Sequence, residues 1–138
     1  MKNSLSTAAE SHQFVEFDKR KIRNRKEKYA IALTAASLIK EGQSVALDTG
    51  TSSYELACVL KNKFQNLTVL TNSLPNACEL VTNRGFTVIA TGGILTADEH
   101  SFISDFATLI IDRVTVDFMF LTAYGVCLEN GITDQRIE

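Results

Sequence analysis

The sequence predicts an α/β fold: a three-layer α/β/α sandwich built around a mostly parallel sheet. Short apolar runs alternate along the chain with segments whose apolar residues have helical spacing. The apolar runs are continuous rather than alternating with polar residues, which is typical of parallel strands covered on both faces. Polar, hydroxyl-rich loops follow four of these runs, at residues 48–53, 71–73, 91–93 and 122–125. Ligands of such sheets bind beyond the carboxyl ends of the strands, so these loops indicate a ligand site.

Residues 1–23 are predicted to form a linker or tail, with at most one short strand at residues 14–17, because they are polar and lack a regular pattern. Seven of the ten residues from 19 to 28 are basic, whereas acids outnumber bases twelve to six from residue 29 onward. Such a basic run either contacts nucleic-acid phosphates or forms a solvated linker and the first turn of a helix. No DNA-binding motif is recognisable beside it, which favours the second interpretation.

The predicted elements follow from capped helices and apolar strands. The first helix begins at Asn24, which forms a capping-box pattern with Glu27, and it ends near Gly42. Ser52 is predicted to cap the second helix and Ser73 the third. The other predicted ranges are helices at 52–64, 73–83 and 101–113 and strands at 45–47, 67–70, 87–90 and 117–122. The dipeptide Asn130-Gly131 predicts a tight turn near the end of the chain.

The composition is that of one globular domain in a reducing compartment. The 138 residues are 45% hydrophobic and 22% charged, and no apolar run reaches the roughly 20 residues that span a bilayer. The first residues lack the apolar core of a signal peptide, so a cytoplasmic protein without a membrane partner is expected. The three cysteines are far apart and metal-ligand spacing is absent, so neither a metal nor a cofactor is predicted.

The loop after the first strand is the strongest candidate for ligand binding. Gly50 lets the backbone turn and present consecutive N–H groups, and the neighbouring hydroxyl groups suit phosphate oxygens. The loop has neither the lysine of a nucleotide-binding phosphate loop nor the glycine spacing of a dinucleotide-binding turn. The alternative is that these residues simply make good turns and caps. The predicted ligand-binding residues are Asp48, Thr49, Gly50, Thr51, Ser52, Ser53, Thr71, Asn72, Ser73, Gly92, Gly93, Thr122, Gly125 and Glu129.

Binding without catalysis is expected, and no catalytic residue is predicted. Isomerisation of a sugar phosphate needs a carboxylate base near the reacting carbon, and the loop at residues 122–125 contains no acid. The acids available in loops are Asp48, Asp98, Glu99 and Glu129. An isomerase or deaminase with Asp48 or Glu129 as its base remains the alternative.

Five segments resemble the effector-sensing domain of DeoR-family bacterial transcriptional regulators, in the same order and spacing over nearly the whole chain. They are residues 24–36, 46–52, 69–75, 92–93 and 120–133. The resemblance implies a fold shared with ribose-5-phosphate isomerase and glucosamine-6-phosphate deaminase, and a phosphorylated sugar as effector with its phosphate on the loop at 48–53. It also implies a homo-oligomeric repressor of sugar metabolism that contacts operator DNA through a helix-turn-helix domain, which is missing here.

On this resemblance, residues 24–138 form a sensing domain that is incomplete at its C-terminus. Thr122 and Ser104 occupy positions where the family usually has glycine, which implies a narrower pocket or a different effector. A third interpretation is a dimerisation fragment that binds no ligand. Such a fragment would associate through residues 24–41 and the exposed edge of the sheet.

Overall fold

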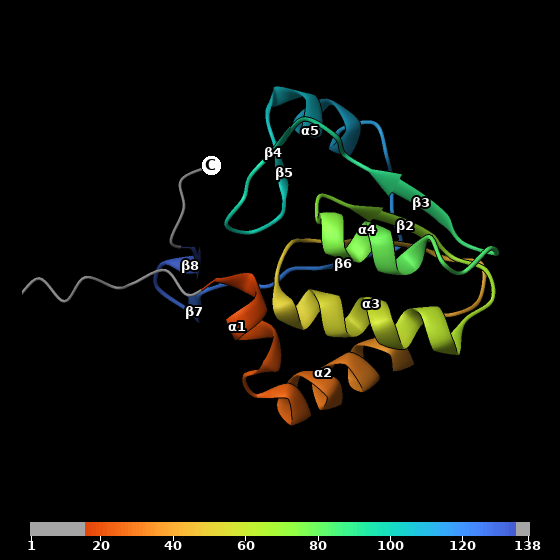
Figure 1. Ribbon diagram of the computed structural model, residues 1–138, viewed down its shortest axis with the longest axis horizontal. Coiled ribbons are helices and arrows are strands. Elements are labelled where there is room, and N and C mark those ends of the chain that lie inside the picture. The colour runs from red at the N-terminus through yellow and green to blue at the C-terminus, as the bar shows by residue number, and fades with distance from the viewer. Residues whose placement is uncertain (1–15, 135–138) are drawn as a thin grey trace, which may run out of the picture.

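A four-stranded parallel sheet forms the centre of the computed structural model, which describes residues 16–134 (Figure 1). The strand order is β3-β2-β1-β6, with β1 at Ser44–Leu47, β2 at Thr68–Thr71, β3 at Thr87–Ala90 and β6 at Phe118–Phe120. The neighbouring strands are parallel and in continuous register, so the carboxyl ends of all four lie at one edge of the sheet. The predicted parallel sheet is therefore confirmed.

Three helices cover one face of this sheet. Their bounds are α2 at Arg25–Ser37, α3 at Thr51–Lys63 and α4 at Leu74–Leu80. Helices α3 and α4 lie along the strands, and α2 packs on the outer side of α3 (Figure 1). Because strand side chains alternate between the two faces, Val45, Leu47 and Val69 point toward Leu60 of α3 and form the buried core with it.

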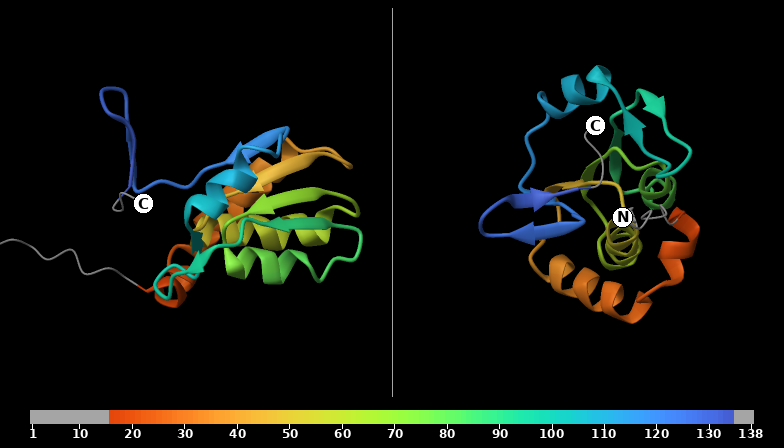
Figure 2. Two further views of the ribbon diagram at one scale, coloured as in Figure 1. Left: turned by 90° about the horizontal axis from the view of Figure 1, so that it is seen from above. Right: turned by 90° about the vertical axis from the view of Figure 1, so that its left-hand side faces the viewer.

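The opposite face carries α5 (Asp105–Ile111), so helices flank the sheet on both sides, as the three-layer prediction requires (Figures 1 and 2). Ala46, Leu70 and Met119 are in register across three strands and belong to this face. Leu70 is 4% exposed, whereas Met119 at the β6 edge is 62% exposed. The described part of this layer therefore covers the middle of the sheet more completely than the β6 edge.

A short helix, α1 (Phe17–Ile22), packs against α3 where the sequence predicts a linker or a short strand. Phe17 is 3% exposed, and its ring lies 6.3 Å from the ring of Tyr54 and 5.7 Å from that of His100. Burial of this aromatic ring holds the polar segment against the domain. The expected strand is wrong for Phe17, and residues 1–15 of the predicted linker lie outside the described residues.

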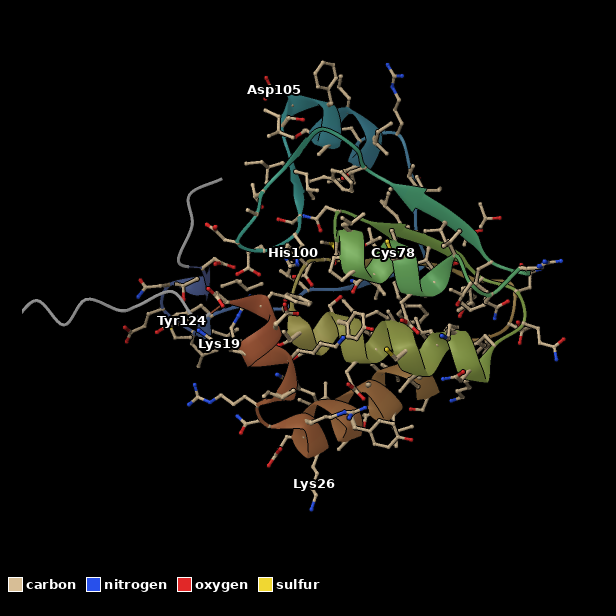
Figure 3. The ribbon with its side chains drawn as sticks, in the orientation of Figure 1. Lys19, Lys26, Cys78, His100, Asp105 and Tyr124 are labelled. Atoms are coloured by element: carbon tan, nitrogen blue, oxygen red, sulfur yellow. The ribbon has the colours of Figure 1, made fainter. Side chains whose placement is uncertain are left out.

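The basic run belongs to the first two helices and to the turn between them. Lys28 Nζ donates to the backbone carbonyls of Arg20 and Arg23, which places a cation at the C-terminal end of α1. Lys26, in contrast, points away from the domain (Figure 3). These placements favour the interpretation of the run as helical turns over that of one continuous surface for nucleic acid.

Several helix ends differ from the prediction, and the local backbone explains two of them. Asn24 precedes α2 as predicted, but it has a left-handed φ of 52° and makes no side-chain cap bond, so the capping box does not form. Helix α3 begins earlier than predicted, because Gly50 and not Ser52 occupies the N-cap. Helices α2 and α4 end several residues sooner than predicted. The predicted cap of α4 is confirmed: Ser73 Oγ accepts a hydrogen bond from the backbone N–H of Asn76 at 3.3 Å.

The predicted helix at residues 101–113 is wrong in its first part. There the chain forms β5 (Phe102–Ile103), which pairs antiparallel with β4 (Ile94–Leu95), and helix α5 begins only afterwards. The backbone N–H of Phe102 donates to the carbonyl of Asn72 at 2.7 Å. Hydrogen bonds to β4 and to the loop after β2 thus hold this segment extended despite its helical composition.

The Asn130-Gly131 turn is confirmed. It joins β7 (Gly125–Cys127) to β8 (Gly131–Thr133) in an antiparallel hairpin that projects away from the sheet (Figure 2). Gly131 has a φ of 71°, which a tight hairpin turn favours in glycine. Within residues 16–134, no helix has the length and apolar character to cross a membrane, and no cluster of three or more His, Cys, Asp or Glu residues is placed to hold a metal ion.

Candidate functional site

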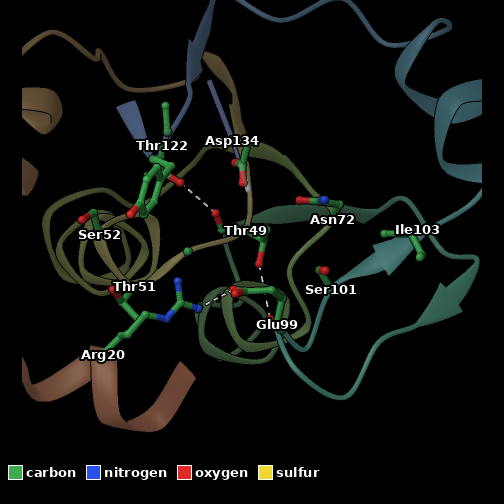
Figure 4. A pocket seen from close by; sticks show the side chains of 13 residues that line it. Arg20, Thr49, Thr51, Ser52, Asn72, Glu99, Ser101, Ile103, Thr122 and Asp134 are labelled. Atoms are coloured by element: carbon green, nitrogen blue, oxygen red, sulfur yellow. Dashed lines mark hydrogen bonds and ion pairs between the residues drawn. The ribbon is translucent and has the colours of Figure 1, made fainter. Parts of the chain in front are cut away.

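A cavity of about 370 Å³ lies at the carboxyl ends of β1, β2 and β6, where polar loops converge (Figure 4). Six predicted site residues line it: Thr49, Gly50, Thr51, Ser52, Asn72 and Thr122. Ala123 and Tyr124 of the fourth predicted loop also contribute to its wall. Residues that are distant in the sequence meet here because the parallel strands end at the same edge of the sheet.

The N-terminus of α3 opens onto this cavity. Gly50 is its N-cap with a φ of 140°, and no side chain caps the helix. The first N–H groups of a helix have no partner within the helix and carry the positive end of its dipole. Thr51 and Ser52 add hydroxyl groups to the same wall. This wall therefore suits an anion that has several oxygen atoms.

Asp48 does not line the cavity but binds Thr122. The backbone N–H of Thr122 donates to Asp48 Oδ2 at 2.6 Å, and Thr122 Oγ1 lies 3.1 and 3.0 Å from the two carboxylate oxygens. Burial raises the pKa of Asp48 to about 6, and the hydrogen bonds from Thr122 limit the rise. The side chain of Asp48 thus joins the ends of β1 and β6.

Three further predicted residues, Ser53, Thr71 and Ser73, are buried behind the cavity wall. They surround Asn76, whose Nδ2 donates to the carbonyl of Asp48 and to Ser53 Oγ, both at 3.0 Å. Ser53 Oγ also donates to the carbonyl of Asp48 at 2.7 Å. This buried network holds the loop at residues 48–53 in shape from behind.

The remaining predicted residues, Gly92, Gly93, Gly125 and Glu129, do not line this cavity. Gly93 packs closely against the start of α5: a Cβ there would lie 2.4 Å from Ser104 Oγ. Gly125 begins β7, and Glu129 lies in the turn of the hairpin. The structure thus brings three of the four predicted loops together and leaves the loop at 91–93 outside the cavity wall.

Charged residues that the sequence does not single out as ligand-binding also line the cavity: Arg20, Glu99 and Asp134. Arg20 Nη2 lies 2.5 Å from Glu99 Oε2, and the Glu99 side chain is 9% exposed. Thr49 Oγ1 donates to the backbone carbonyl of Glu99 at 3.4 Å. Glu99 is recognisable in the sequence only as a loop acid, and nothing in the basic run distinguishes Arg20 from its neighbours.

Residues 23–138 match the family model described as the DeoR C terminal sensor domain. The chain belongs to the DeoR family. This DeoR-family chain is 38% identical over 125 residues to the HTH-type transcriptional regulator GolR of Listeria innocua, an alignment that covers 91% of the chain and 49% of that protein. It is 35% identical over 113 residues to the transcriptional repressor AccR of Agrobacterium fabrum, covering 82% and 43%. The chain spans about half the length of these curated relatives.

Two residues at positions where the resemblance implies glycine have defined roles in this DeoR sensor domain. Thr122 Oγ1 bonds to the Asp48 carboxylate and also donates to the carbonyl of Thr49 at 2.8 Å. Ser104 has a φ of 156°, and its Oγ accepts from the backbone N–H of Phe106 at 3.2 Å at the start of α5. Through its bonds to Asp48 and Thr49, Thr122 links the loop at residues 122–125 to the loop at residues 48–53.

Proposed function

We propose that this chain is the effector-binding domain of a DeoR-type transcriptional repressor of sugar metabolism, and that its effector is a phosphorylated sugar. The observation that carries the proposal is that the uncapped N-terminus of α3 and hydroxyl groups from several strand ends share one cavity. The helix N-terminus suits a phosphate, and the hydroxyl and amide side chains suit the hydroxyl groups of a sugar. The names of the relatives, transcriptional regulator and transcriptional repressor, support the regulatory role.

The positions of the two acids that the sequence offers as a catalytic base support binding without catalysis. Of the two acids that could serve as the base of an isomerase or deaminase, Asp48 has both oxygens bonded to Thr122, and Glu129 lies in the hairpin turn outside the cavity wall. A general base must lie within hydrogen-bonding reach of the substrate proton that it removes. Glu99 and Asp134 do line the cavity, but Glu99 is paired with Arg20, and the relatives are named as transcriptional regulators. We therefore expect no turnover of any aldose or ketose phosphate.

The whole regulator is proposed to be a cytoplasmic homo-oligomer that contacts operator DNA through a helix-turn-helix domain elsewhere in the protein. Ile31 and Leu38, seven residues apart at α2, are exposed, and such apolar side chains on one side of a helix support association between copies. Light scattering of this chain with and without sugar phosphates tests whether association occurs and whether it depends on a ligand.

Thermal unfolding with a panel of sugar phosphates and their unphosphorylated parents tests the proposed function. A ligand at 100 times its dissociation constant adds about 2.7 kcal/mol of stability, which raises the melting temperature by several degrees. A rise with one or two phosphorylated compounds only is the expected result. A cooperative transition that no compound moves would favour the dimerisation fragment. A separate assay for product after incubation with each sugar phosphate tests the isomerase or deaminase, which product formation would favour.

A further inference from the structure

Helix α1 contributes the one cation among the described residues that line the cavity. Arg20 extends from α1 toward Glu99 and lies beside Thr51, the first residue of α3 (Figure 4). The same wall contains two acids, Glu99 and Asp134. The strand-end loops of the cavity, which the sequence identifies, provide no positively charged side chain of their own.

We propose that Arg20 binds the anionic group of the effector together with the N-terminus of α3, and that ligand binding and the docking of α1 therefore stabilise each other. This inference rests on the proposed function, because it names a binding residue and a form of regulation for the same site. It assigns to α1, which the sequence places in a linker, a direct part in ligand recognition.

The charge balance of the cavity supports a role for Arg20. A helix N-terminus is equivalent to about half a positive charge, so with two carboxylates on the same wall the sum is about −1.5 without Arg20 and about −0.5 with it. A guanidinium adds a full charge and has five N–H donors in a planar fork, so it can hold a carboxylate and a phosphate oxygen at the same time. Its bond to the largely buried Glu99 keeps the guanidinium group at the cavity.

The contacts of α1 explain why binding and docking would be coupled. Phe17 is buried between Tyr54 of α3 and His100, and Lys21 Nζ lies 4.0 Å from the centre of the Tyr54 ring. Arg20 pairs with Glu99, next to His100. Helix α1 thus rests on α3 and the loop at 98–100, which also form the cavity wall. A ligand that contacts Arg20 only while α1 is docked must favour the docked state, and docking must raise ligand affinity by the same factor.

Calorimetric titration with inorganic phosphate tests the binding role of Arg20. We expect Arg20→Gln to weaken phosphate binding at least tenfold, and Arg20→Lys to weaken it less because the charge remains. The matched control is Lys19→Gln, which makes the same charge change on the same helix at a side chain that is 72% exposed. This control should change the affinity less than twofold.

Glu99→Gln separates a binding role of Arg20 from a merely structural one. If Arg20 binds the anion, Glu99→Gln weakens phosphate binding far less than Arg20→Gln does, because the guanidinium remains in the chain and a competing negative charge is removed. If Arg20 only anchors α1 through Glu99, Arg20→Gln and Glu99→Gln weaken binding equally, and that result overturns the proposal. Circular dichroism of each variant shows whether it has kept its fold.

Hydrogen exchange of the α1 amides tests the coupling. Inorganic phosphate should slow exchange at residues 17–22 in the unaltered chain and leave it unchanged in Arg20→Gln. Phosphate affinity that is equal in the unaltered chain and in Arg20→Gln overturns this inference but not the proposed function. If neither inorganic phosphate nor any sugar phosphate binds the unaltered chain, both are overturned. Binding without slower exchange in α1 overturns the coupling.

Discussion

Thr122 Oγ1 lies 2.7 Å from the position that a Cβ would take on Gly50. These two residues, 72 positions apart, therefore pack directly against each other where the N-terminus of α3 meets the loop after β6. The same hydroxyl bonds to the Asp48 carboxylate, which joins β1 to β6. A side chain at position 50 would have to displace Thr122 and disturb this bond. The packing of the cavity wall and the conformation of the helix cap therefore depend on each other.

Gly50→Ala is expected to destabilise the chain by about 1–3 kcal/mol and to lower its affinity for sugar phosphates, because it adds both backbone strain and a clash with Thr122. Urea denaturation and ligand titration measure the two effects. Gly42→Ala is the matched control, since Gly42 also has a positive φ, of 83°, but has no atom within 4 Å of the added Cβ. If Gly42→Ala lowers affinity as much as Gly50→Ala, the contact with Thr122 is not responsible.

The Asp48→Asn variant should change how stability depends on pH. Burial raises the pKa of Asp48 from 3.8 to about 6, so between these pH values the folded chain holds a proton that the unfolded chain has released. The resulting stabilisation is complete below the lower pKa and disappears as the pH rises through the upper one, a total of about 1–3 kcal/mol. Relative to the unaltered chain, Asp48→Asn should therefore gain stability from pH 4 to pH 7. Parallel stability curves would show that Asp48 is not responsible.

Thr122→Val keeps the shape of the side chain but removes the hydroxyl that bonds to Asp48 and to the carbonyl of Thr49. We expect a loss of about 1–2 kcal/mol in the free energy of unfolding at neutral pH and a further rise in the pKa of Asp48. Carboxyl-carbon NMR titration follows that pKa. Thr82→Val is the control, because the Thr82 hydroxyl bonds to a carbonyl on an exposed helix end. An unchanged pKa of Asp48 in Thr122→Val would contradict the assigned role.

Asn76→Ala should destabilise the chain by about 1–3 kcal/mol, since its buried Nδ2 donates to the carbonyl of Asp48 and to Ser53 Oγ. It should also weaken ligand binding, because the loop at 48–53 loses its support. Asn62→Ala is the comparison: its Nδ2 donates to the carbonyl of Cys58 at 2.9 Å, but on an exposed helix surface. Equal losses for the two variants, measured by urea denaturation, would show that the buried network adds no stability of its own.

Local patterns in the sequence were enough to predict the sheet. Each of its four strands is a short apolar run bounded by turn residues, and the predicted ranges lie within two residues of the observed ones at either end. The cap at Ser73 and the turn at Asn130-Gly131 were equally predictable, because a few neighbouring residues provide their hydrogen bonds and backbone angles. Parallel strand order then implies that the loops after β1, β2 and β6 meet at one edge.

The sequence by itself thus determined the α/β sheet, the loops at its carboxyl edge and six residues of the cavity wall. Only the tertiary structure decided that α1 docks, that Arg20 meets Glu99, and that Asp48 binds Thr122 and does not line the cavity. The physical reason is the range of the interactions. Strands, turns and caps depend on neighbouring residues. The direction of the Arg20 side chain depends instead on the burial of Phe17 between Tyr54 and His100, which lie 37 and 83 positions further along the chain.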